Sequence, residues 1–482
     1  MSRQIFVDRE RELEFLERRY SSEKAELIII YGRRRIGKTE LLLHFAKDKP
    51  YVYFLATEKP YHENIRDLQR LMAEFLGDPL FSRISFGNID ELLMAFAEKI
   101  GDERVVLIID EFPVLIENYR PVLSLLQRAW DLKLSKTKLM LILCGSSVST
   151  METEVLGYKS PLYGRRTGQW KVDEIPFFNI SEFLPSYSVE NLIKVYGVVG
   201  GIPAYLLQFD PEKSFKENVV ENVLSKGSYL YEEAEILLRE ELREPANYFA
   251  ILEAIASGRT RFGEIVSATG LDKSLVSKYL TVLQRLGIVE REVPITATHK
   301  EASKRGLYSI SDNYFAFWFR YVLPNRSHLE AGLAEEVWER SREDFDAYMG
   351  TVFESLVRKP GVFLRLTGFR FTKLGRWWHK NEEIDVVALD GEEERALLVE
   401  VKWKDLTARE ARGILKDLER KAELLRLDSW EKRYGLVAKS LKGKERLRVK
   451  GWLVWDLSDF ESLLSRSISK NSLLSSGTNL GL

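Results

Sequence analysis

A short loop near the start of the chain has the residue types and spacing of a phosphate-binding site. The pattern G-x-x-x-x-G-K-T is formed by Gly32, Arg33, Arg34, Arg35, Ile36, Gly37, Lys38 and Thr39. An apolar run (27–31) precedes the loop and a helical pattern beginning at Glu40 follows it. This context distinguishes a phosphate-binding loop from a chance match. The alternative, a glycine-rich turn with an incidental lysine, leaves that context unexplained.

The chemistry of such a loop follows from its backbone. Gly32 and Gly37 allow the chain to curl so that successive N–H groups point at phosphate oxygens, and the next helix adds the partial positive charge of its N-terminus. Lys38 is expected to reach the β- and γ-phosphates, and the Thr39 hydroxyl to bind Mg²⁺. All residues from Gly32 to Glu40 are therefore candidate contacts of ATP or ADP.

Two carboxylates, Asp110 and Glu111, end an apolar run at residues 105–109. Hydrolysis at a phosphate-binding loop needs an acid that positions Mg²⁺ and a group that orients the attacking water. We expect Asp110 to hold the metal through water and Glu111 to polarise the hydrolytic water. Two solvated acids at the end of a strand are the alternative, and the upstream loop favours the catalytic interpretation.

Two further polar groups are candidates for sensing or stabilising the γ-phosphate. Ser146 follows another apolar run (139–144) and is preferred over Ser147, although turn chemistry explains a serine there nearly as well. Arg165 lies beside Arg166 in a glycine-flanked turn and could stabilise charge that develops on the γ-phosphate. A solvated basic turn is the alternative, and action across a subunit boundary would require a homo-oligomer.

The elements that must position these residues alternate along the first part of the chain. Strands are expected at 27–31, 51–56, 105–109 and 139–144, each followed by turn-like or helical sequence. Such alternation favours a parallel sheet covered by helices. We therefore expect a P-loop ATPase core at 1–175, followed by a helical lid at 176–244.

The order of the motifs resembles that of a known family. The segment Phe6-Val7-Asp8-Arg9, the loop at 32–39, the acids at 110–111, the turn at 164–166 and Gly200-Gly201-Ile202-Pro203 recur in this order in the archaeal AAA-like ATPases of the signal-transduction (STAND) group. The resemblance implies that Phe6, Val7 and Arg9 pack against adenine and ribose. It also implies that Pro203 touches the base and reports the nucleotide state.

Residues 245–312 have the order of a winged helix-turn-helix. Helices are expected at 248–256, 262–269 and 274–286, and two strands, 288–293 and 306–310, around a polar loop at 296–305. The third helix has the polar side of a recognition helix in the major groove, and Lys300, Lys304 and Arg305 of the wing are expected to reach phosphates. Because the charge density is modest, a protein–protein module is the alternative. A helical connector is expected at 313–345.

A second candidate site lies in the C-terminal block, where we expect a domain at 346–464. Asp385 falls in one strand-like run, and Glu400 and Lys402 fall in the next. Residues two apart on a strand share a face, and a hairpin would bring Asp385 beside Glu400. Two carboxylates that hold Mg²⁺, with a lysine that orients water or stabilises the transition state, suit metal-assisted phosphodiester hydrolysis.

This cluster is similar to the motif of the PD-(D/E)xK nuclease family: an acidic helix residue, then Asp, then Glu-x-Lys. Carried over, Glu354 matches the helix acid, Asp385 the central acid, and Glu400 and Lys402 the Glu-x-Lys pair. Ile384 stands where the family name has proline. The resemblance implies a restriction-endonuclease-like α/β domain. Exposed edge strands often carry similar charges, so a fold of this kind without cleavage is the alternative.

Composition restricts the partners and the compartment. The chain has 72 Lys and Arg against 73 Asp and Glu, a net charge of −1, which excludes a generally polycationic nucleic-acid coat and leaves local patches for DNA. The single cysteine, Cys144, permits no internal disulfide. No apolar stretch matches a signal peptide or a membrane span. We expect a cytoplasmic protein with a flexible tail at 465–482.

These observations together predict a multidomain α/β protein whose ATP state governs DNA binding and Mg²⁺-dependent DNA cleavage. The rival is a regulatory ATPase switch that binds DNA or a protein partner through its winged helix and does not cleave. A homo-oligomer or a protein that triggers hydrolysis fits either function.

Overall fold

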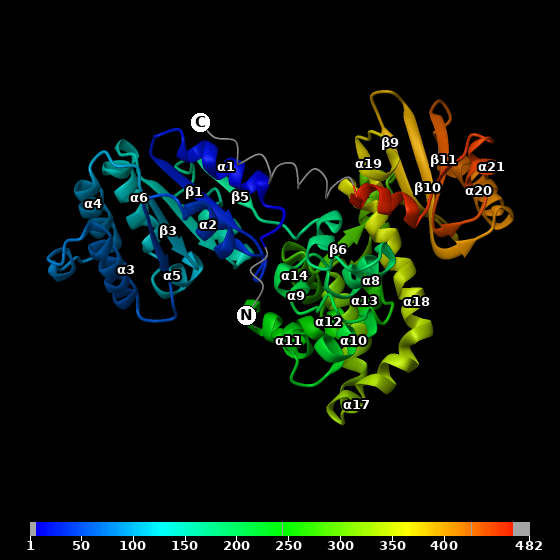
Figure 1. The fold of residues 1–482 in the computed structure, drawn as a ribbon, viewed down its shortest axis with the longest axis horizontal. Coiled ribbons are helices and arrows are strands. Elements are labelled where there is room, and N and C mark those ends of the chain that lie inside the picture. The colour runs from blue at the N-terminus through cyan, green and yellow to red at the C-terminus, as the bar shows by residue number, and fades with distance from the viewer. Residues whose placement is uncertain (1–5, 243, 426, 466–482) are drawn as a thin grey trace. The chain divides into compact units, whose positions relative to one another are not determined.

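The structure is a computed structural model that describes residues 6–242, 244–425 and 427–465. The chain forms two compact units. One comprises Met1–Ile175 with Ile202–Ala204, and the other comprises Pro176–Gly201 with Tyr205–Leu482 (Figure 1). The division after residue 175 falls where the first domain was expected to end. Apart from Ser465, the expected tail lies outside the described residues.

The first unit is built on a parallel sheet. Its described strands lie in the order β2-β3-β4-β1-β5, and each neighbouring pair is parallel. The bounds are Glu26–Tyr31 (β1), Tyr51–Leu55 (β2), Val106–Asp110 (β3), Met140–Gly145 (β4) and Gly168–Lys171 (β5). The four expected strands are thus confirmed to within one residue at each end. β5 is missing from the expected set because its sequence, Gly-Gln-Trp-Lys, has no apolar run.

Helices cover this sheet and complete its core. They are α1 (Glu10–Tyr20), α2 (Lys38–Ala46), α3 (Tyr61–Leu76), α4 (Ile89–Ile100), α5 (Phe112–Asn118), α6 (Val122–Leu132) and α7 (Val148–Thr150). Figure 1 shows α3, α4 and α6 together on one side of the sheet. β1, β3 and β4 are buried along their whole length, as expected for parallel strands covered on both faces.

The second unit begins with a helical region. Its helices are α8 (Val189–Val199), α10 (Phe215–Val219), α11 (Tyr229–Glu241), α16 (Asn313–Phe317), α17 (Arg326–Glu330) and α18 (Ala334–Arg358). The short helix α9 (Pro203–Leu206) has residues in both units. The boundary expected between residues 345 and 346 is wrong, because α18 runs through it. Buried Phe345, Tyr348, Met349 and Val352 continue the helical spacing across that point.

The winged helix-turn-helix is present in the order expected. It consists of α12 (Pro245–Ala256), α13 (Phe262–Thr269), α14 (Lys273–Arg285), β6 (Val289–Glu292) and β7 (Leu307–Ile310), with β6 and β7 antiparallel. The expected polar loop at 296–305 is wrong in its second half, which forms α15 (His299–Arg305). Thr298 and Glu301 cap this helix reciprocally, a signature readable from Thr-x-x-Glu.

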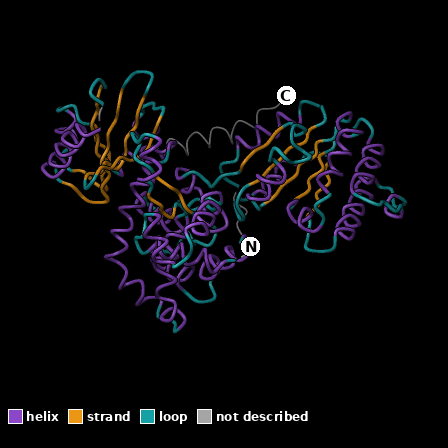
Figure 2. Tube along the Cα trace, turned by 180° about the vertical axis from the view of Figure 1, so that it is seen from behind, coloured by secondary structure: helices purple, strands orange, loops and turns teal. Residues whose placement is uncertain are grey.

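The C-terminal part of the second unit is a mixed sheet with the described order β12-β11-β10-β9-β8. Its strands are Lys373–His379 (β8), Glu382–Asp390 (β9), Arg395–Leu406 (β10), Glu431–Leu441 (β11) and Leu453–Trp455 (β12), and its helices are α19 (Pro360–Thr367), α20 (Ala408–Ala422) and α21 (Lys444–Arg448). β8, β9 and β10 form an antiparallel meander, and α20 leads to β11, parallel to β10. Figure 2 shows the strands of each large sheet in orange.

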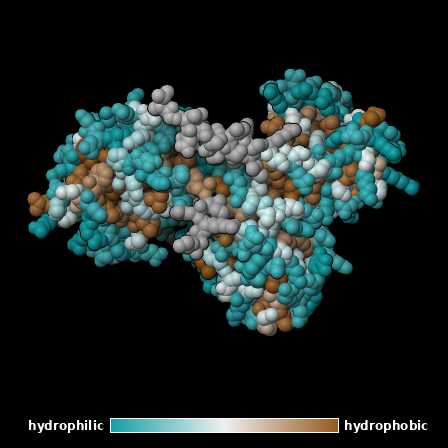
Figure 3. Space-filling model, viewed as in Figure 1, coloured by the Kyte–Doolittle hydropathy of each residue, from teal (hydrophilic) through white to brown (hydrophobic). Residues whose placement is uncertain are grey.

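On the face drawn in Figure 3, hydrophilic side chains cover most of the surface, with hydrophobic groups scattered between them. Large exposed apolar side chains, such as Tyr158 and Val449, lie in separate parts of the chain. Single exposed apolar residues are ordinary on soluble surfaces. Within the described ranges, no helix is both long enough and apolar enough to span a bilayer.

Candidate nucleotide site and candidate C-terminal site

The loop between β1 and α2 has the backbone geometry of an anion-binding nest. Arg35 and Gly37 adopt left-handed conformations, with φ of 65° and 88°, and such residues turn backbone N–H groups toward one point. Gly32 is required for a different reason, since a Cβ there would lie 2.4 Å from the Val172 carbonyl oxygen. The loop therefore fits phosphate, and α2 begins at Lys38 directly behind it.

Lysine and hydroxyl groups lie where a nucleotide with a divalent cation would use them. The buried Lys38 ammonium donates to the carbonyls of Gly32 (3.0 Å) and Arg33 (2.9 Å), and thus folds over its own loop. The Thr39 hydroxyl donates to Asp110 Oδ2 at 2.7 Å. This hydroxyl–carboxylate pair is the oxygen donor set that Mg²⁺ prefers, so the residues present fit the expected group.

The two acids after β3 have separate environments. Asp110, 1% exposed, accepts hydrogen bonds from Thr39 and from the Tyr53 hydroxyl (3.0 Å). Glu111 is half-buried in a left-handed conformation (φ 50°), and its Oε2 accepts a hydrogen bond from the Ser146 hydroxyl at 2.7 Å. Ser146 directly follows β4, which lies between β1 and β3, so the topology brings the serine to Glu111.

Burial dominates the electrostatics of the neighbouring weak acids. Burial, followed by the charge of Asp110, raises the pKa of the Tyr53 hydroxyl. Burial also raises the pKa of the Cys144 thiol, and Asp110 adds to the effect. Both groups stay protonated, so Tyr53 remains a donor to the Asp110 carboxylate. Ser147, the alternative to Ser146, instead donates to the Thr150 hydroxyl at 2.9 Å.

The N-terminal residues expected near the base lie against the loop and its helix. Arg9, 5% exposed, donates to the carbonyls of Ile36 (2.9 Å) and Asp173 (3.1 Å). Val7 is buried, and the half-exposed Phe6 ring stacks on His44 of α2 with centroids 4.1 Å apart. Arg9 thus braces the loop. Contacts of these residues with adenine and ribose stay predictions.

Pro203 was expected in the helical lid, but Ile202–Ala204 cluster with the first unit. The flanking residues, Gly201 and Tyr205, belong to the second unit. The segment with Pro203 therefore clusters with the first unit, although the residues on either side of it belong to the second. Its predicted contact with the base remains a prediction.

Arg165 lies near the N-terminal ends of the strands, whereas the phosphate-binding loop follows the C-terminal end of β1. Gly168, the first residue of β5, pairs with Ile28 of β1. Ile28 precedes Gly32 by four residues, a distance of about 13 Å along the strand. Arg165 precedes Gly168 and is held by Asp131 through bonds of 2.8 Å from Nε and Nη2. The topology argues against a contact with the nucleotide of the same chain; a contact across a subunit boundary stays a prediction.

The C-terminal candidates converge on one point between β9 and β10. The Lys402 ammonium donates to Asp385 Oδ2 and Glu400 Oε2, both at 2.8 Å. The backbone N–H of Val401 also donates to Asp385 Oδ2, at 2.8 Å. Asp385 and Glu400 are each 3% exposed. The expected hairpin is confirmed, and it places the acids together because the strands pair antiparallel.

Glu354 joins this cluster from α18. Burial, and then the nearby Asp385 charge, raise the pKa of the Glu354 carboxyl to about 7. Burial and Asp385 also raise the pKa of Glu400. Burial opposes the charge of Lys402, but Asp385 and Glu400 outweigh it and raise the pKa of the ammonium group. Ionisable groups whose pKa values are shifted by burial and by one another are typical of functional sites.

Sequence reasoning missed a second lysine in this cluster. Lys421, at the end of α20, donates to Glu400 Oε1 at 3.0 Å. Because it lies on another element, no local spacing reveals it; only its apolar neighbours Leu418 and Ala422, which direct α20 onto the sheet, hint at it. Among the described residues, no group of three or more His, Cys, Asp or Glu side chains is arranged to hold a metal ion.

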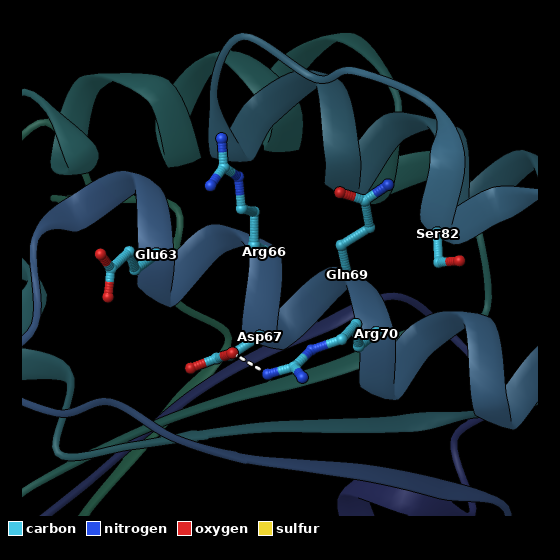
Figure 4. A pocket seen from close by; sticks show the side chains of 6 residues that line it. All are labelled: Glu63, Arg66, Asp67, Gln69, Arg70 and Ser82. Carbon is cyan, nitrogen blue, oxygen red and sulfur yellow. Dashed lines mark hydrogen bonds and ion pairs between the residues drawn. The ribbon is translucent and has the colours of Figure 1, made fainter.

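A hollow on the first unit lies apart from these residues. Figure 4 shows that α3 supplies most of its lining. Gln69 donates to the carbonyls of Phe81 and Ile84, and Asp67 forms an ion pair with Arg70. These three side chains are therefore paired within the protein.

The fold and the loop geometry define a P-loop ATPase with a winged helix. Residues 6–209 match the model of an ATPase domain predominantly from Archaea, and residues 246–293 match an IclR helix-turn-helix domain. Residues 318–414 match a family described as archaeal and bacterial proteins of unknown function. The Walker-type ATPase PABY2304 of Pyrococcus abyssi has the same fold over 66% of this chain and 97% of its own, with a TM-score of 0.51 and 22% identity.

The chain belongs to the family of the uncharacterized protein MJECL04 of Methanocaldococcus jannaschii. The two are 40% identical over 459 residues, which cover 95% of this chain and 100% of the relative. An uncharacterized ATP-binding protein of the same organism, MJ0423, is 58% identical over 45 residues, 9% of this chain and 76% of its own.

Proposed function

We propose that this ATPase uses its nucleotide state to control DNA binding by the winged helix and Mg²⁺-dependent DNA cleavage by the C-terminal cluster. The observation that carries the proposal is the convergence of Asp385, Glu400 and Lys402, with Lys402 2.8 Å from each carboxylate, in the same unit as the winged helix. DNA supplies phosphodiesters, the substrate that this chemistry suits.

At the nucleotide site, bound Mg²⁺·ATP would supply the γ-phosphate and its metal. The chain's own residues do the rest: the loop N–H groups and Lys38 hold phosphate oxygens, and Thr39 and Asp110 face the metal. Glu111 orients the attacking water, and its hydrogen bond to Ser146 fixes the carboxylate. Phe6, Val7, Arg9 and Pro203 are proposed to surround the base and ribose.

At the C-terminal site, a bound Mg²⁺ would supply an activated water. Asp385 and Glu400 are the residues that would hold it, and Glu354 can accept or release the proton because its pKa lies near 7. Lys402 would then move its hydrogen bonds from the carboxylates to the substrate phosphate. A meander followed by a helix and a parallel strand, with acids at the middle strands, supports a restriction-endonuclease-like fold.

The packing of α18 supports control of this site by nucleotide. Tyr348 of α18 donates to the Gly197 carbonyl of α8 at 2.6 Å, and a Cβ on Gly197 would touch Met349 and Val352. α8 leads into Ile202–Ala204, which cluster with the first unit. Glu354 lies less than two turns beyond Tyr348, so a shift of α8 moves the helix that carries this acid.

A regulatory switch without cleavage is the second candidate. It is favoured by the absence, within the described part of the chain, of any group of three or more candidate metal-ligating side chains. Lys402 and Lys421 together neutralise Asp385 and Glu400, an arrangement that also suits a structural ion-pair network. Under this alternative the winged helix binds DNA or a protein partner according to nucleotide state.

A cleavage assay separates the two functions. Purified protein is incubated with labelled linear, branched and single-stranded DNA in Mg²⁺ or Mn²⁺, with and without ATP, beside Lys402→Ala. Metal-dependent cutting that ATP changes and that the variant loses supports the nuclease. Nucleotide-dependent DNA binding without cutting by the wild type supports the switch and removes the cleavage step from the proposal.

A further inference from the structure

Two arginines flank the C-terminal cluster and face the wing of the winged helix. Arg358, the last residue of α18, donates through Nη1 to the Asp385 carbonyl at 3.2 Å, and its Nη2 lies 3.1 Å from Glu292 Oε1. Arg376 of β8 donates to Glu292 Oε2 at 3.3 Å and to Glu383 at 3.0 Å. One wing carboxylate therefore bridges both guanidinium groups.

This bridge is shielded from solvent. Arg358 is 14% exposed, Glu292 16% and Arg376 23%, in contrast to the exposed ion pairs elsewhere on the surface, which contribute little. Further contacts hold the wing in place: the Ile295 N–H donates to the Arg376 carbonyl at 3.0 Å, and Arg305 donates to the Trp378 carbonyl. Arg305, expected to reach phosphates, is thus engaged within the protein.

The charges on this surface are complementary. Glu290 and Glu292 are two residues apart on β6 and share a face, and they meet Arg358, Lys359 and Arg376. Burial and the nearby Glu292 raise the pKa of Glu290, while Arg358 and Lys359 act in the opposite sense. The Arg376 Nε is buried without a hydrogen-bond partner, so Glu292 leaves part of the cationic surface unsatisfied.

A nucleic-acid backbone would accept more hydrogen bonds from these arginines than one carboxylate does. A guanidinium forms two parallel hydrogen bonds with a phosphate, and adjacent phosphates offer more acceptor oxygens than a single glutamate. We propose that Arg358 and Arg376 are the phosphate-binding surface of the C-terminal site, and that Glu292 of the wing occupies it as a stand-in for DNA phosphate.

The consequence is competition between the wing and DNA for the same two arginines. While Glu292 holds them, a DNA strand gains little by approaching Asp385 and Lys402. Once the wing is displaced, both guanidinium groups become available beside the cluster. This inference rests on the proposed function only in taking DNA as the ligand of the C-terminal site.

Fluorescence anisotropy with a labelled DNA duplex in EDTA tests this competition without cleavage. We expect Glu292→Gln to tighten binding about fivefold and to steepen the salt dependence by about one to two phosphate contacts. Adding Arg358→Gln and Arg376→Gln to that variant should return both quantities to the wild-type values. Glu292→Asp, which keeps the charge, should stay close to wild type.

Glu253→Gln is the matched control. It also removes one negative charge from an exposed glutamate of the winged helix, on α12, but not from the carboxylate that bridges the two arginines. The affinity of this variant for DNA should change by less than about twofold, the effect of net charge alone. Circular dichroism melting of every variant identifies any that fails to fold.

The outcomes separate this inference from the proposed function. If Glu292→Gln binds DNA no more tightly than Glu253→Gln, the inference is wrong, even when the wild type cleaves DNA and Lys402→Ala does not. If Glu292→Gln binds more tightly and the arginine substitutions reverse the gain, the inference stands, even when no variant cleaves. If neither the wild type nor Glu292→Gln binds DNA at low salt, both are wrong.

Discussion

At the scale of single residues, each site is held ready by hydrogen bonds inside the chain. Lys38 folds onto the carbonyls of Gly32 and Arg33, and Glu111 is fixed by Ser146. In the proposed mechanism these bonds are exchanged: a phosphate recruits the lysine, and an attacking water competes for the glutamate. The side chains therefore need no large rearrangement to act, which keeps the entropy cost of catalysis low.

The hydrogen bond between Ser146 and Glu111 predicts a specific kinetic effect. Ser146→Ala leaves Glu111 without its orienting donor, so we expect kcat for ATP hydrolysis to fall at least about tenfold with a small change in KM. Ser147→Ala is the control, because that hydroxyl bonds Thr150 instead. Steady-state hydrolysis rates measure both variants, and equal losses in the two would contradict the assigned role.

The raised pKa of Glu354 predicts a pH-dependent stability. A carboxyl whose pKa rises from 4.5 in the unfolded chain to about 7 in the folded one stabilises the folded state fully below the lower value. That contribution is lost as the pH rises through 7. Relative to Glu354→Gln, the wild type should lose roughly 3 kcal/mol of unfolding free energy between about pH 4.5 and pH 8.

Urea denaturation of both proteins across this pH range provides the measurement. Titrating groups far from Glu354 contribute equally to the wild type and the variant, so they cancel in the difference. A difference that is constant with pH would mean that the Glu354 carboxyl is not buried beside Asp385.

At the scale of elements, α18 does the most to join the parts of the second unit. Its first half packs aromatic side chains with α10 and α16, and its last turns carry Glu354 and Arg358 to the C-terminal sheet. A helix of 25 residues is about 37 Å long. It is long enough to link α10 and α16 with the carboxylate–lysine cluster.

The contact between Tyr348 and Gly197 is the central attachment of this helix. Tyr348→Phe removes a buried donor and leaves the Gly197 carbonyl without it, so we expect a loss of about 1–2 kcal/mol in unfolding free energy. If α18 transmits the nucleotide state, the variant also weakens the effect of ATP on DNA affinity. Chemical denaturation and DNA titration with and without ATP measure the two effects; Tyr434→Phe, a half-buried tyrosine of β11, is the control.

Sequence patterns predicted the elements that have a strong local signal. The apolar strands of the first sheet, the helix order of the winged unit and the Asp385–Glu400 hairpin all follow from runs and alternation. β5 and β8 lack such a signal: β8 is rich in Gly, Arg and Trp, and it is a strand because β9 supplies its partner. Contacts between distant elements, such as Lys421 with Glu400 or the wing with Arg358, have no local signature.

The same limit applies to the positions of Arg165 and Pro203. The sequence shows that an arginine lies in a glycine-flanked turn. Whether this arginine lies near the N-terminal or the C-terminal ends of the strands depends on how β5 pairs with β1. Likewise, the sequence around Pro203 does not reveal that Ile202–Ala204 cluster with the first unit. Residue types predict chemistry, while strand pairing decides which groups meet.

At the scale of the whole molecule, the chain is two compact units with separate cores. The phosphate-binding loop lies in the first, and the winged helix and the carboxylate–lysine cluster lie in the second. ATP binds the first unit alone in this account, so its effect on DNA must pass through the segments that join the units.

This organisation predicts two transitions in differential scanning calorimetry. Because a ligand stabilises only the state that binds it, Mg²⁺·ATP at about 100 times its Kd should raise the transition of the first unit by roughly 5–10 °C. Gly32→Ala, whose new Cβ would lie 2.4 Å from the Val172 carbonyl, should abolish that shift. A single transition that ATP does not move would contradict the two-unit account.

The affinity for DNA with and without Mg²⁺·ATP, compared between wild type and Lys38→Ala, tests the central claim most directly. The account predicts that ATP changes the wild-type Kd by at least about tenfold, a coupling of roughly 1.4 kcal/mol. It predicts no change in Lys38→Ala, which cannot hold the phosphates. Equal affinities of the wild type in both conditions would contradict the claim that the phosphate-binding loop controls the second unit.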